Sequence, residues 1–468
     1  MKLTNNAAWL IGCRVSGDLL NLLLFVIISR HLGPAGIGAY SYGFAVSTFV
    51  FVIGCLGIEE YGLRRFARIE SDRRASFFAE LLGAQLLMIA VAIVGVAVYL
   101  ALTRATHATI LTVALLTAFQ ASVAIARTLF IPSMSQQRMM LPAVADLLMR
   151  ALAFGIAGLT IQFSNVALPL SLIGFPVSAV LLMIVGSQSA ARYGAPVRVA
   201  ISRPTLSGIA AVLWSFALIE VFVQLLSRVG VIALTLHSGQ AAAGVFATGL
   251  RLVEVTLMPL AFLGVAAYPR LSQLYVSNTE EFRRDSSQLM WLMVLVSAGS
   301  AWGLTFIAPV LLVPVLGARF AGMEPAVAAM AFVAVVQGLE VTLGRLLYSS
   351  DRQVRRAWII VAGAALNTVL CVLLVPRAGV YGAIAAGAAS YAMIDIAYAL
   401  TLRRPVTARR LLLILAALAA GLALGATVTA VFAGWALPLW ARALGSAAAF
   451  LAVVGSTYWY ASARSAPL

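Results

Sequence analysis

AAWLIGCRVSGDLLNLLLFVIIS, residues 7–29, is long enough to cross a bilayer as a helix, yet it carries Arg14 and Asp18 within an apolar run. A helix needs about 20 mostly apolar residues to span the hydrocarbon core. A guanidinium at that depth costs about 2.5–3.5 kcal/mol, so it usually faces a polar interior. The charged pair also interrupts the apolar core that a cleavable signal peptide requires. The stretch therefore predicts a retained membrane helix with a polar site inside the membrane.

The rest of the chain repeats this apolar pattern. Of 468 residues, 62% are hydrophobic and only 10% are charged, which excludes a soluble multidomain protein. We predict an all-α polytopic membrane protein with about 14 transmembrane helices. The expected spans are residues 7–29, 37–58, 79–102, 110–131, 141–163, 166–186, 209–236, 241–268, 289–316, 326–348, 358–375, 379–401, 411–432 and 439–460.

The net charge of +16 lies mostly in alternate loops. Clusters follow the second, sixth, eighth, tenth and twelfth spans, and they include Arg64, Arg65, Arg73, Arg74, Arg192, Arg198, Arg203, Arg270, Arg283, Arg284, Arg352, Arg355, Arg356, Arg403, Arg404, Arg409 and Arg410. The positive-inside rule then places these loops and both termini of the multi-pass protein in the cytoplasm. The basic excess therefore reports topology, and we expect no nucleic-acid partner.

Nothing in the chain predicts catalysis, a cofactor or a metal. Cys13, Cys55 and Cys371 are far apart and lie in or beside spans, where they serve as small packing residues. No connecting loop is long enough for an ATPase or glycosyltransferase domain, and no Walker A, nucleophile elbow or zinc pattern occurs. We expect a protein that is not an enzyme.

The two halves resemble each other weakly. AGIGAYSYG at 35–43 echoes AGVFATGLR at 243–251, and SMSQQRM from Ser133 has the placement of SSDRQVR from Ser349. Both offsets are about 210 residues, which predicts parallel six-helix repeats related by an axis along the membrane normal. The expected domains are an N-terminal lobe at 1–200, a C-terminal lobe at 206–404 and two additional helices at 408–462, with a central cavity between the lobes.

Charged residues inside the spans are the candidate site. Arg14 with Asp18, and Asp146 with Arg150, are spaced i, i+4, while Arg251 and Glu254 are spaced i, i+3. Glu220 shares a helical stripe with Gln224 and Arg228. Because guanidinium groups match phosphate oxygens in bidentate fashion, the predicted anion-binding residues are Arg14, Arg150, Arg251 and Arg228. The predicted cavity acids, which could couple transport to an ion, are Asp18, Asp146, Glu220 and Glu254.

The alternative for these residues is structural. Polar pairs can hold membrane helices together at about 0.6 kcal/mol per interaction. Arg127 and Arg345 lie near the cytoplasmic ends of their predicted spans, and for them we favour snorkelling to the headgroups.

Three segments resemble a known family. SRHLGPAGIGAYSYG from Ser29 and LNTVLCVLLVPRAGVYGAIAAGAASY from Leu366 are similar to the span 1–2 and span 11–12 junctions of polysaccharide (O-antigen and exopolysaccharide) flippases. These belong to the multidrug/oligosaccharidyl-lipid/polysaccharide exporter superfamily. The segment from Phe246, FATGLRLVEVTLMPLAFLGVAAYPRLSQLY, resembles the eighth span of lipid II flippases in that superfamily, with Arg251, Glu254, Pro259, Pro269 and Ser272 matching.

The resemblance implies a fold like that of the multidrug (MATE) transporters, with two six-helix lobes that alternate between inward-open and outward-open forms. It also implies a substrate, an undecaprenyl-pyrophosphate-linked oligosaccharide moved from the cytoplasmic to the periplasmic leaflet for polysaccharide or lipopolysaccharide synthesis. Membrane lipids surround such a protein, and polymerases and glycosyltransferases of the same pathway are its expected partners. By position, Arg14, Asp18 and Arg251 match charged positions of the family.

Two other functions stay open at this point. A drug or cation antiporter of the same superfamily would have a cavity dominated by acids and aromatic residues, whereas here arginines accompany the acids. A membrane enzyme of glycan assembly would need a sizeable outer loop with catalytic side chains, and the outer loops are short.

Overall fold

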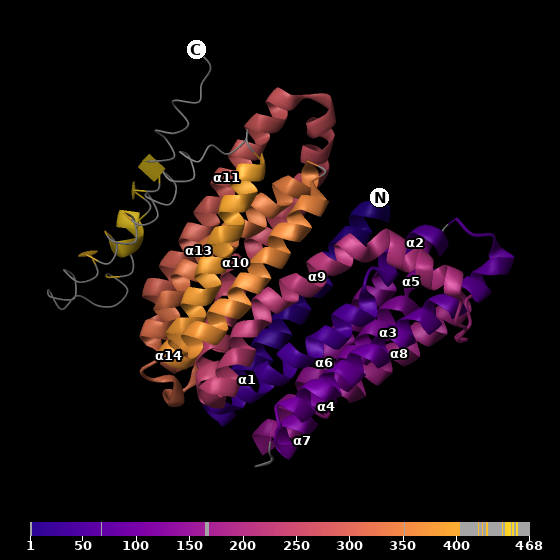
Figure 1. The fold of residues 1–468 in the computed structure, drawn as a ribbon, viewed down its shortest axis with the longest axis horizontal. Coiled ribbons are helices and arrows are strands. Elements are labelled where there is room, and N and C mark those ends of the chain that lie inside the picture. The colour runs from indigo at the N-terminus through magenta and orange to yellow at the C-terminus, as the bar shows by residue number, and fades with distance from the viewer. Residues whose placement is uncertain are drawn as a thin grey trace. The chain divides into compact units, whose positions relative to one another are not determined.

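The computed structural model describes residues 2–66, 68–163, 168–350 and 352–402, with a few short stretches between 420 and 456 (Figure 1). Every regular element in these ranges is helical. The longer helices are α1 (Lys2–Cys55), α3 (Arg74–Leu102), α4 (His107–Leu129), α6 (Met140–Phe163), α8 (Gly174–Arg192), α9 (Arg203–His237), α10 (Gly239–Ser277), α11 (Thr279–Trp302), α13 (Glu324–Ser349) and α14 (Gln353–Leu402). The shorter ones are α2 (Ile58–Phe66), η1 (Ser71–Arg73), α5 (Ile131–Ser135), α7 (Leu168–Ser171), η2 (Gly303–Ile307), α12 (Ala308–Leu316) and η3 (Ala318–Phe320).

The predicted membrane fold class is confirmed. Within the described ranges, ten helical segments are long and apolar enough to cross a membrane. Two of them, α1 and α14, each contain two of the predicted spans, so the ten segments account for the first twelve spans. The last two spans, at 411–432 and 439–460, lie largely outside the described residues.

The junctions inside α1 and α14 depend on glycine. Gly33 has φ 65° and ψ −165°, and Pro34 follows it. Gly379 has φ 51° and ψ −127°, three residues after Pro376. These dihedral angles are outside the helical region and open to glycine because it lacks a Cβ. Each kink thus lies at the boundary between two predicted spans.

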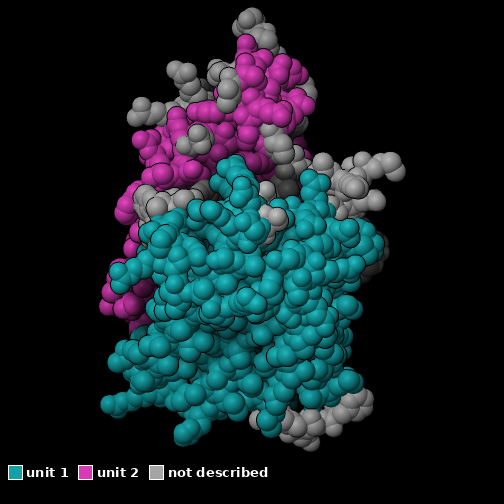
Figure 2. Space-filling view, turned by 90° about the vertical axis from the view of Figure 1, so that its right-hand side faces the viewer, with its two compact units in different colours: residues 1–244, 315–319 teal, residues 245–314, 320–468 magenta. Residues whose placement is uncertain are grey.

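The helices form two compact units, which Figure 2 shows in different colours. Unit 1 contains residues 1–244 and 315–319, and unit 2 contains residues 245–314 and 320–468. In unit 1, α1 packs on α4 and α6, and α8 lies beside both (Figure 1). In unit 2, α13 packs on α11 and α14. The lobe boundaries expected from the repeat, 1–200, 206–404 and 408–462, stay a prediction.

One helix crossing in unit 1 brings the beginnings of the two echoing segments into contact. A Cβ on Gly38 would lie 1.8 Å from the backbone oxygen of Gln240, and a Cβ on Gly244 would lie 1.8 Å from that of Pro34. The two contacts are reciprocal: each helix brings a glycine against a backbone oxygen of the other. The sequence separation from Pro34 to Gln240 equals that from Gly38 to Gly244. Only glycine permits this approach, because backbone touches backbone.

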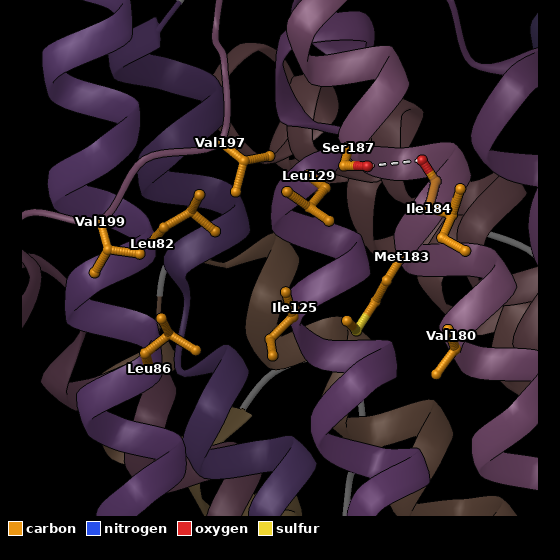
Figure 3. A pocket seen from close by; sticks show the side chains of 10 residues that line it. All are labelled: Leu82, Leu86, Ile125, Leu129, Val180, Met183, Ile184, Ser187, Val197 and Val199. Atoms are coloured by element: carbon orange, nitrogen blue, oxygen red, sulfur yellow. Dashed lines mark hydrogen bonds between the residues drawn. The ribbon is translucent and has the colours of Figure 1, made fainter.

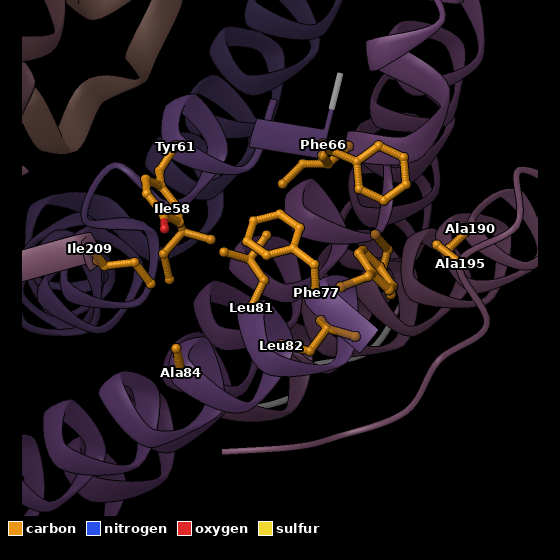
Figure 4. Close-up of a cluster of buried hydrophobic side chains, with 13 residues drawn as sticks. Ile58, Tyr61, Phe66, Phe77, Leu81, Leu82, Ala84, Ala190, Ala195 and Ile209 are labelled. Atoms are coloured by element: carbon orange, nitrogen blue, oxygen red, sulfur yellow. The ribbon is translucent and has the colours of Figure 1, made fainter. Parts of the chain in front are cut away.

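The buried core of unit 1 includes a cluster beneath the basic segment that follows the second span. Side chains from α2, α3, α8 and α9 meet there, and Figure 4 shows Ile58, Tyr61, Phe66, Phe77, Leu81, Leu82 and Ile209 among them. The guanidinium of Arg65 lies 5.9 Å from the ring centroid of Tyr61, and that of Arg74 lies 5.5 Å from that of Phe66. The cations that predict topology are therefore also packed on aromatic faces at the end of the bundle.

Candidate functional site

The first charged cluster joins α1 to α6 through Arg150. Its Nε donates to Asp146 Oδ2 at 2.9 Å, one helical turn away, and one Nη donates to Asp18 Oδ1 at 3.0 Å, on α1. A Cβ on Gly17 would lie 2.6 Å from Arg150 Cδ. The glycine thus makes room for the arginine stem on the surface of α1. The sequence predicted each helix's own pair, and the structure adds the contact between helices.

Arg14 has a different environment in the same cluster. Its Nε lies 4.0 Å from Asp18 Oδ2, and its side chain is 72% exposed. At 1.5 Å per residue, Arg14 lies about 10 Å inside the predicted span 7–29. A guanidinium so exposed at that depth requires water, a polar cavity or an anion. Its own carboxylate neighbour is already engaged by Arg150.

The cluster holds two cations and two anions, so it is neutral overall. Arg150 and Asp18 are about three-quarters buried, and Asp146 is more exposed. Partial exposure lets an anionic ligand approach while the carboxylates hold the arginine in place. The hydrogen bonds described above occupy only two of the nitrogens of Arg150, which carries five N–H donors.

Arg251 and Glu254 form the third predicted pair, on α10 in unit 2. Arg251 Nη1 donates to Glu254 Oε2 at 3.1 Å, and both side chains are partly exposed. The pair spans i, i+3 on one helix, as the spacing predicted. Since this pair belongs to unit 2, its convergence with Arg14 and Arg150 on one cavity stays a prediction.

Arg228 and Glu220 lie on α9. The Arg228 guanidinium lies 5.7 Å from the ring centroid of Phe44, so it packs on α1 through a cation–π contact. Glu220 is exposed. Whether either residue binds substrate stays a prediction.

The arginines for which snorkelling was favoured make protein contacts. Arg127 Nη1 lies 3.8 Å from Glu59 Oε2, and its guanidinium lies 4.9 Å from the ring centroid of Phe51, with half of its side chain exposed. The Arg345 side chain packs against Gly264, whose Cβ would lie 3.2 Å from Arg345 Nε. These contacts favour a packing role for both residues.

Sequence reasoning missed a second charged cluster, in unit 2. Arg356 Nη2 donates to Glu340 Oε1 at 3.3 Å, and both side chains are almost completely buried. Asp395 and Tyr398 on α14 are buried beside them. The sequence did contain a signal for this cluster, because Glu340 and Asp395 are acidic residues inside the predicted spans 326–348 and 379–401. Arg356 was expected in a loop before span 358–375, whereas α14 begins at Gln353.

An apolar pocket of about 230 Å³ lies elsewhere in unit 1, and none of the predicted site residues lines it (Figure 3). Its walls come from α3, α4, α8 and the segment after α8. The only polar side chain among them, Ser187, donates to the carbonyl of Ile184 at 2.8 Å. Because no lining side chain can recognise a charged group, the pocket suits hydrocarbon and not a headgroup.

No group of three or more His, Cys, Asp or Glu side chains placed to hold a metal ion occurs among the described residues. The geometry thus offers arginine–carboxylate pairs within apolar helices, and these pairs can bind and release an anion.

Known structures share this fold. A lipid II flippase MurJ in an inward closed conformation matches with a TM-score of 0.75 at 13% identity, over 97% of this chain and 99% of that chain. A multidrug resistance MATE family transporter of the MOP superfamily, in an inward-facing conformation, has a TM-score of 0.60 at 14% identity, over 83% and 94%. The Vibrio cholerae MATE transporter VcmN, in its bent form, has a TM-score of 0.52 at 15% identity, over 86% and 98%. No curated protein sequence gives a significant match.

A family model described as polysaccharide biosynthesis protein matches residues 3–275, more than half of the chain. The matched region includes Arg14, Asp18, Asp146, Arg150, Arg228, Arg251 and Glu254. The all-helical membrane fold, the charged pairs inside its helices and this match lead to one conclusion: the chain belongs to the polysaccharide biosynthesis protein family and has the fold of the MOP superfamily transporters.

Proposed function

We propose that this protein is a flippase for polyprenyl-pyrophosphate-linked oligosaccharides, with an undecaprenyl carrier, and that it moves them from the cytoplasmic to the periplasmic leaflet of a bacterial inner membrane. The glycans would serve polysaccharide or lipopolysaccharide assembly, O-antigen among them, and the pathway's glycosyltransferases and polymerase would be partners. The family match and the transporter fold support a lipid-linked substrate.

The observation that carries the proposal is the Arg14–Asp18–Arg150–Asp146 cluster. It places one well-exposed guanidinium beside a second that two carboxylates hold rigidly. A pyrophosphate offers several oxygens to such a pair, and charge-assisted bonds from guanidinium are stronger than neutral ones. When the substrate leaves, Asp18 and Asp146 still neutralise Arg150, so the empty site stays stable inside the membrane.

We propose that Arg251 supplies a further phosphate contact and that Arg228 lies at the edge of the same site. In this arrangement Asp18, Asp146, Glu220 and Glu254 set the charge of the cavity and keep the arginines oriented. Alternating access of the two halves then carries the headgroup across while the polyprenyl tail stays in lipid.

The charge pattern disfavours a drug or cation antiporter. A cationic substrate needs carboxylates that are available to it, but Asp18, Asp146 and Glu254 are each within ion-pair distance of an arginine. Anion recognition fits the cluster better than cation recognition.

The test is glycan export by variants of Arg251 in a strain that lacks the protein. Arg251→Ala should abolish surface glycan while the protein still inserts, because a cation has been removed from membrane depth. Arg251→Lys should restore only part of it, since an ammonium cannot reproduce the bidentate fork. The control is Arg377→Ala, a change at an exposed arginine that donates to the carbonyl of Leu373.

Protein amounts are matched by immunoblot. Normal surface glycan from Arg251→Ala at equal expression would exclude Arg251 from the site. Drug efflux by the wild-type protein, with unchanged glycan on deletion, would favour the antiporter. Reporter fusions to both termini test the orientation, which requires both termini on the cytoplasmic side.

A further inference from the structure

The buried cluster of unit 2 has an unbalanced charge. Glu340 on α13 and Asp395 on α14 are both acids, and Arg356 on α14 is the one cation that pairs with either of them among the described residues. Glu340 acts electrostatically on Asp395, so the three form one group. With every member ionised, the group carries one excess negative charge inside the membrane.

Arg356 forms its ion pair with Glu340. Its guanidinium lies on α13 at Gly344, where a Cβ would come 3.0 Å from Arg356 Nε, and it stacks 4.4 Å from the ring centroid of Tyr348. Arg356 is only three residues inside α14, yet its side chain is 11% exposed and so turns inward. The arginine therefore neutralises Glu340 and leaves Asp395 uncompensated.

Asp395 lacks the contacts that a buried carboxylate needs. It is 3% exposed, and neither of its carboxyl oxygens accepts a hydrogen bond from any part of the chain that the structure describes. An isolated carboxylate in a low-dielectric interior costs so much that the group neutralises itself instead. The carboxyl must therefore take up a cation.

The surroundings of Asp395 are buried and closely packed. Gly363 and Ile394 bring the two halves of α14 together, since a Cβ on Gly363 would lie 2.4 Å from Ile394 Cδ1. Ile360, Leu343 and Ile394 are completely buried. Asp395 lies seven residues before the end of α14, about 10 Å inside it. Release of a bound cation thus requires movement of α13 and α14.

We propose that Asp395 is the proton-binding group of a coupling site in unit 2, with the Glu340–Arg356 pair as its fixed electrostatic partner. One proton brings the cluster to neutrality. When the helices open, the O–H bond of the Asp395 carboxyl breaks and the proton passes to water as H₃O⁺. The carboxylate that remains takes up a proton before the helices close again.

A proton fits the cluster better than a metal ion does. Metal cations require several oxygen ligands, whereas the described groups around Asp395 are an arginine-paired carboxylate and the Tyr398 hydroxyl. A proton needs only the carboxyl oxygen.

Within the described ranges, few titratable or charged groups face the site. From α13 they are Glu340 and Tyr348, and from α14 they are Arg356 and Tyr398. Arg345 on α13 packs instead on Gly264 of α10. The pH response of Asp395 is therefore set by this group of side chains and by the opening of the helices around it.

The coupling role rests on the proposed transport function, but proton binding can be measured without transport. The first experiment uses infrared spectroscopy of the full chain in nanodiscs, in H₂O and D₂O near neutral pH. We expect the C=O band of a buried protonated carboxyl with slow deuterium exchange. Asp395→Asn should remove the band, and the matched change Asp72→Asn, at an exposed acid outside the spans, should leave it unchanged.

Absence of the band from the wild-type spectrum, or its persistence in Asp395→Asn, would overturn the proposal. Loss of the wild-type band on adding Na⁺, but not choline, would overturn it in favour of a sodium site. If Asp395→Asn fails to fold, Asp395→Glu gives the readout, because it keeps the carboxyl and should shift the band.

The second experiment measures translocation of a fluorescent polyprenyl-pyrophosphate glycolipid in proteoliposomes. With one proton per cycle, a gradient of one pH unit should shift the leaflet distribution about tenfold. Asp395→Asn, which cannot release a proton, should lose this shift. A normal infrared band without any glycolipid translocation would refute the proposed function alone, whereas translocation that ignores pH would refute coupling alone.

Discussion

The charged cluster of unit 1 and that of unit 2 contain the same kinds of side chain in opposite surroundings. Arg150 bridges Asp18 and Asp146 at 3.0 and 2.9 Å in a partly exposed site. Arg356 pairs with Glu340 in an almost completely buried site, and within the described ranges the carboxyl oxygens of Asp395 beside it accept no hydrogen bond. In the first cluster both carboxylates are paired with an arginine and the side chains are partly exposed, which suits reversible binding of an anion. In the second cluster the Asp395 carboxyl is buried and accepts no hydrogen bond from the described residues, which suits binding of a proton.

The difference predicts where stability is most sensitive. Removing one partner of a buried pair leaves an uncompensated charge, whereas water can solvate what remains in an exposed one. The predictions below use the stability of the purified protein to test this contrast.

The largest effect is expected from Arg356→Ala. It leaves Glu340 and Asp395 buried without a cation, and breaking a buried pair typically costs about 3–5 kcal/mol. Thermal unfolding in detergent should show a clear drop in midpoint, and Glu340→Gln combined with Arg356→Ala should recover part of it. A midpoint equal to that of wild type would mean that water reaches the cluster, and the contrast would fail.

Substitutions of Gly344 and Gly17 compare how tightly the neighbouring arginines, Arg356 and Arg150, are packed. A Cβ at Gly344 would lie 3.0 Å from Arg356 Nε and 3.4 Å from Glu340 Oε1, in a pair that is almost completely buried. Gly344→Ala should therefore cost about 1–3 kcal/mol, as overpacking does. Gly17→Ala also displaces its arginine, because a Cβ there would lie 2.6 Å from Arg150 Cδ. It should nevertheless cost less than Gly344→Ala, because the site is partly exposed and alanine favours the helix by about 0.5–1 kcal/mol.

Gly12→Ala is the control for both, since a Cβ there meets nothing within 4 Å. The same thermal unfolding assay applies to the three variants. Equal destabilisation by Gly17→Ala and Gly344→Ala would show that the two arginines are held with equal rigidity.

A double-mutant cycle on Asp18→Asn and Arg150→Gln measures the bond between α1 and α6. Interactions of this kind in membrane proteins couple by about 0.6–1.7 kcal/mol, and we expect a value in that range because the site is partly exposed. The free energy of unfolding in bilayers provides the measurement. Coupling of several kcal/mol would indicate a dry cluster like that of unit 2.

The smallest effect on stability is expected from Arg14→Ala. An exposed pair at 4.0 Å contributes little, so the free energy of unfolding should change by no more than about 0.5 kcal/mol. Glycolipid translocation at limiting substrate should nevertheless fall, because the exposed guanidinium is a proposed phosphate ligand. A stable variant with unchanged translocation would leave Arg150 as the anion ligand on α1 and α6.

The class of protein and the approximate positions of its helices follow from the amino-acid sequence alone. Apolar length predicts spans because an unpaired backbone cannot enter lipid, and the first twelve spans correspond to described helices. The ends of the apolar runs, at 29 and 37 and at 375 and 379, predicted the junctions inside α1 and α14, and the structure places kinks there at Gly33 and Gly379. The pairs Asp146–Arg150 and Arg251–Glu254 also followed from spacing, since helical geometry is local.

Tertiary structure decided the contacts between distant residues. Asp18 and Arg150 are 132 residues apart, and no local period predicts that the arginine would join α1 to α6 at Gly17. Arg356 looked like a loop cation, but packing turned it inward to Glu340 and so created the uncompensated Asp395. Whether a charge is open to water or dry depends on which helices surround it, and a one-dimensional pattern does not contain that information.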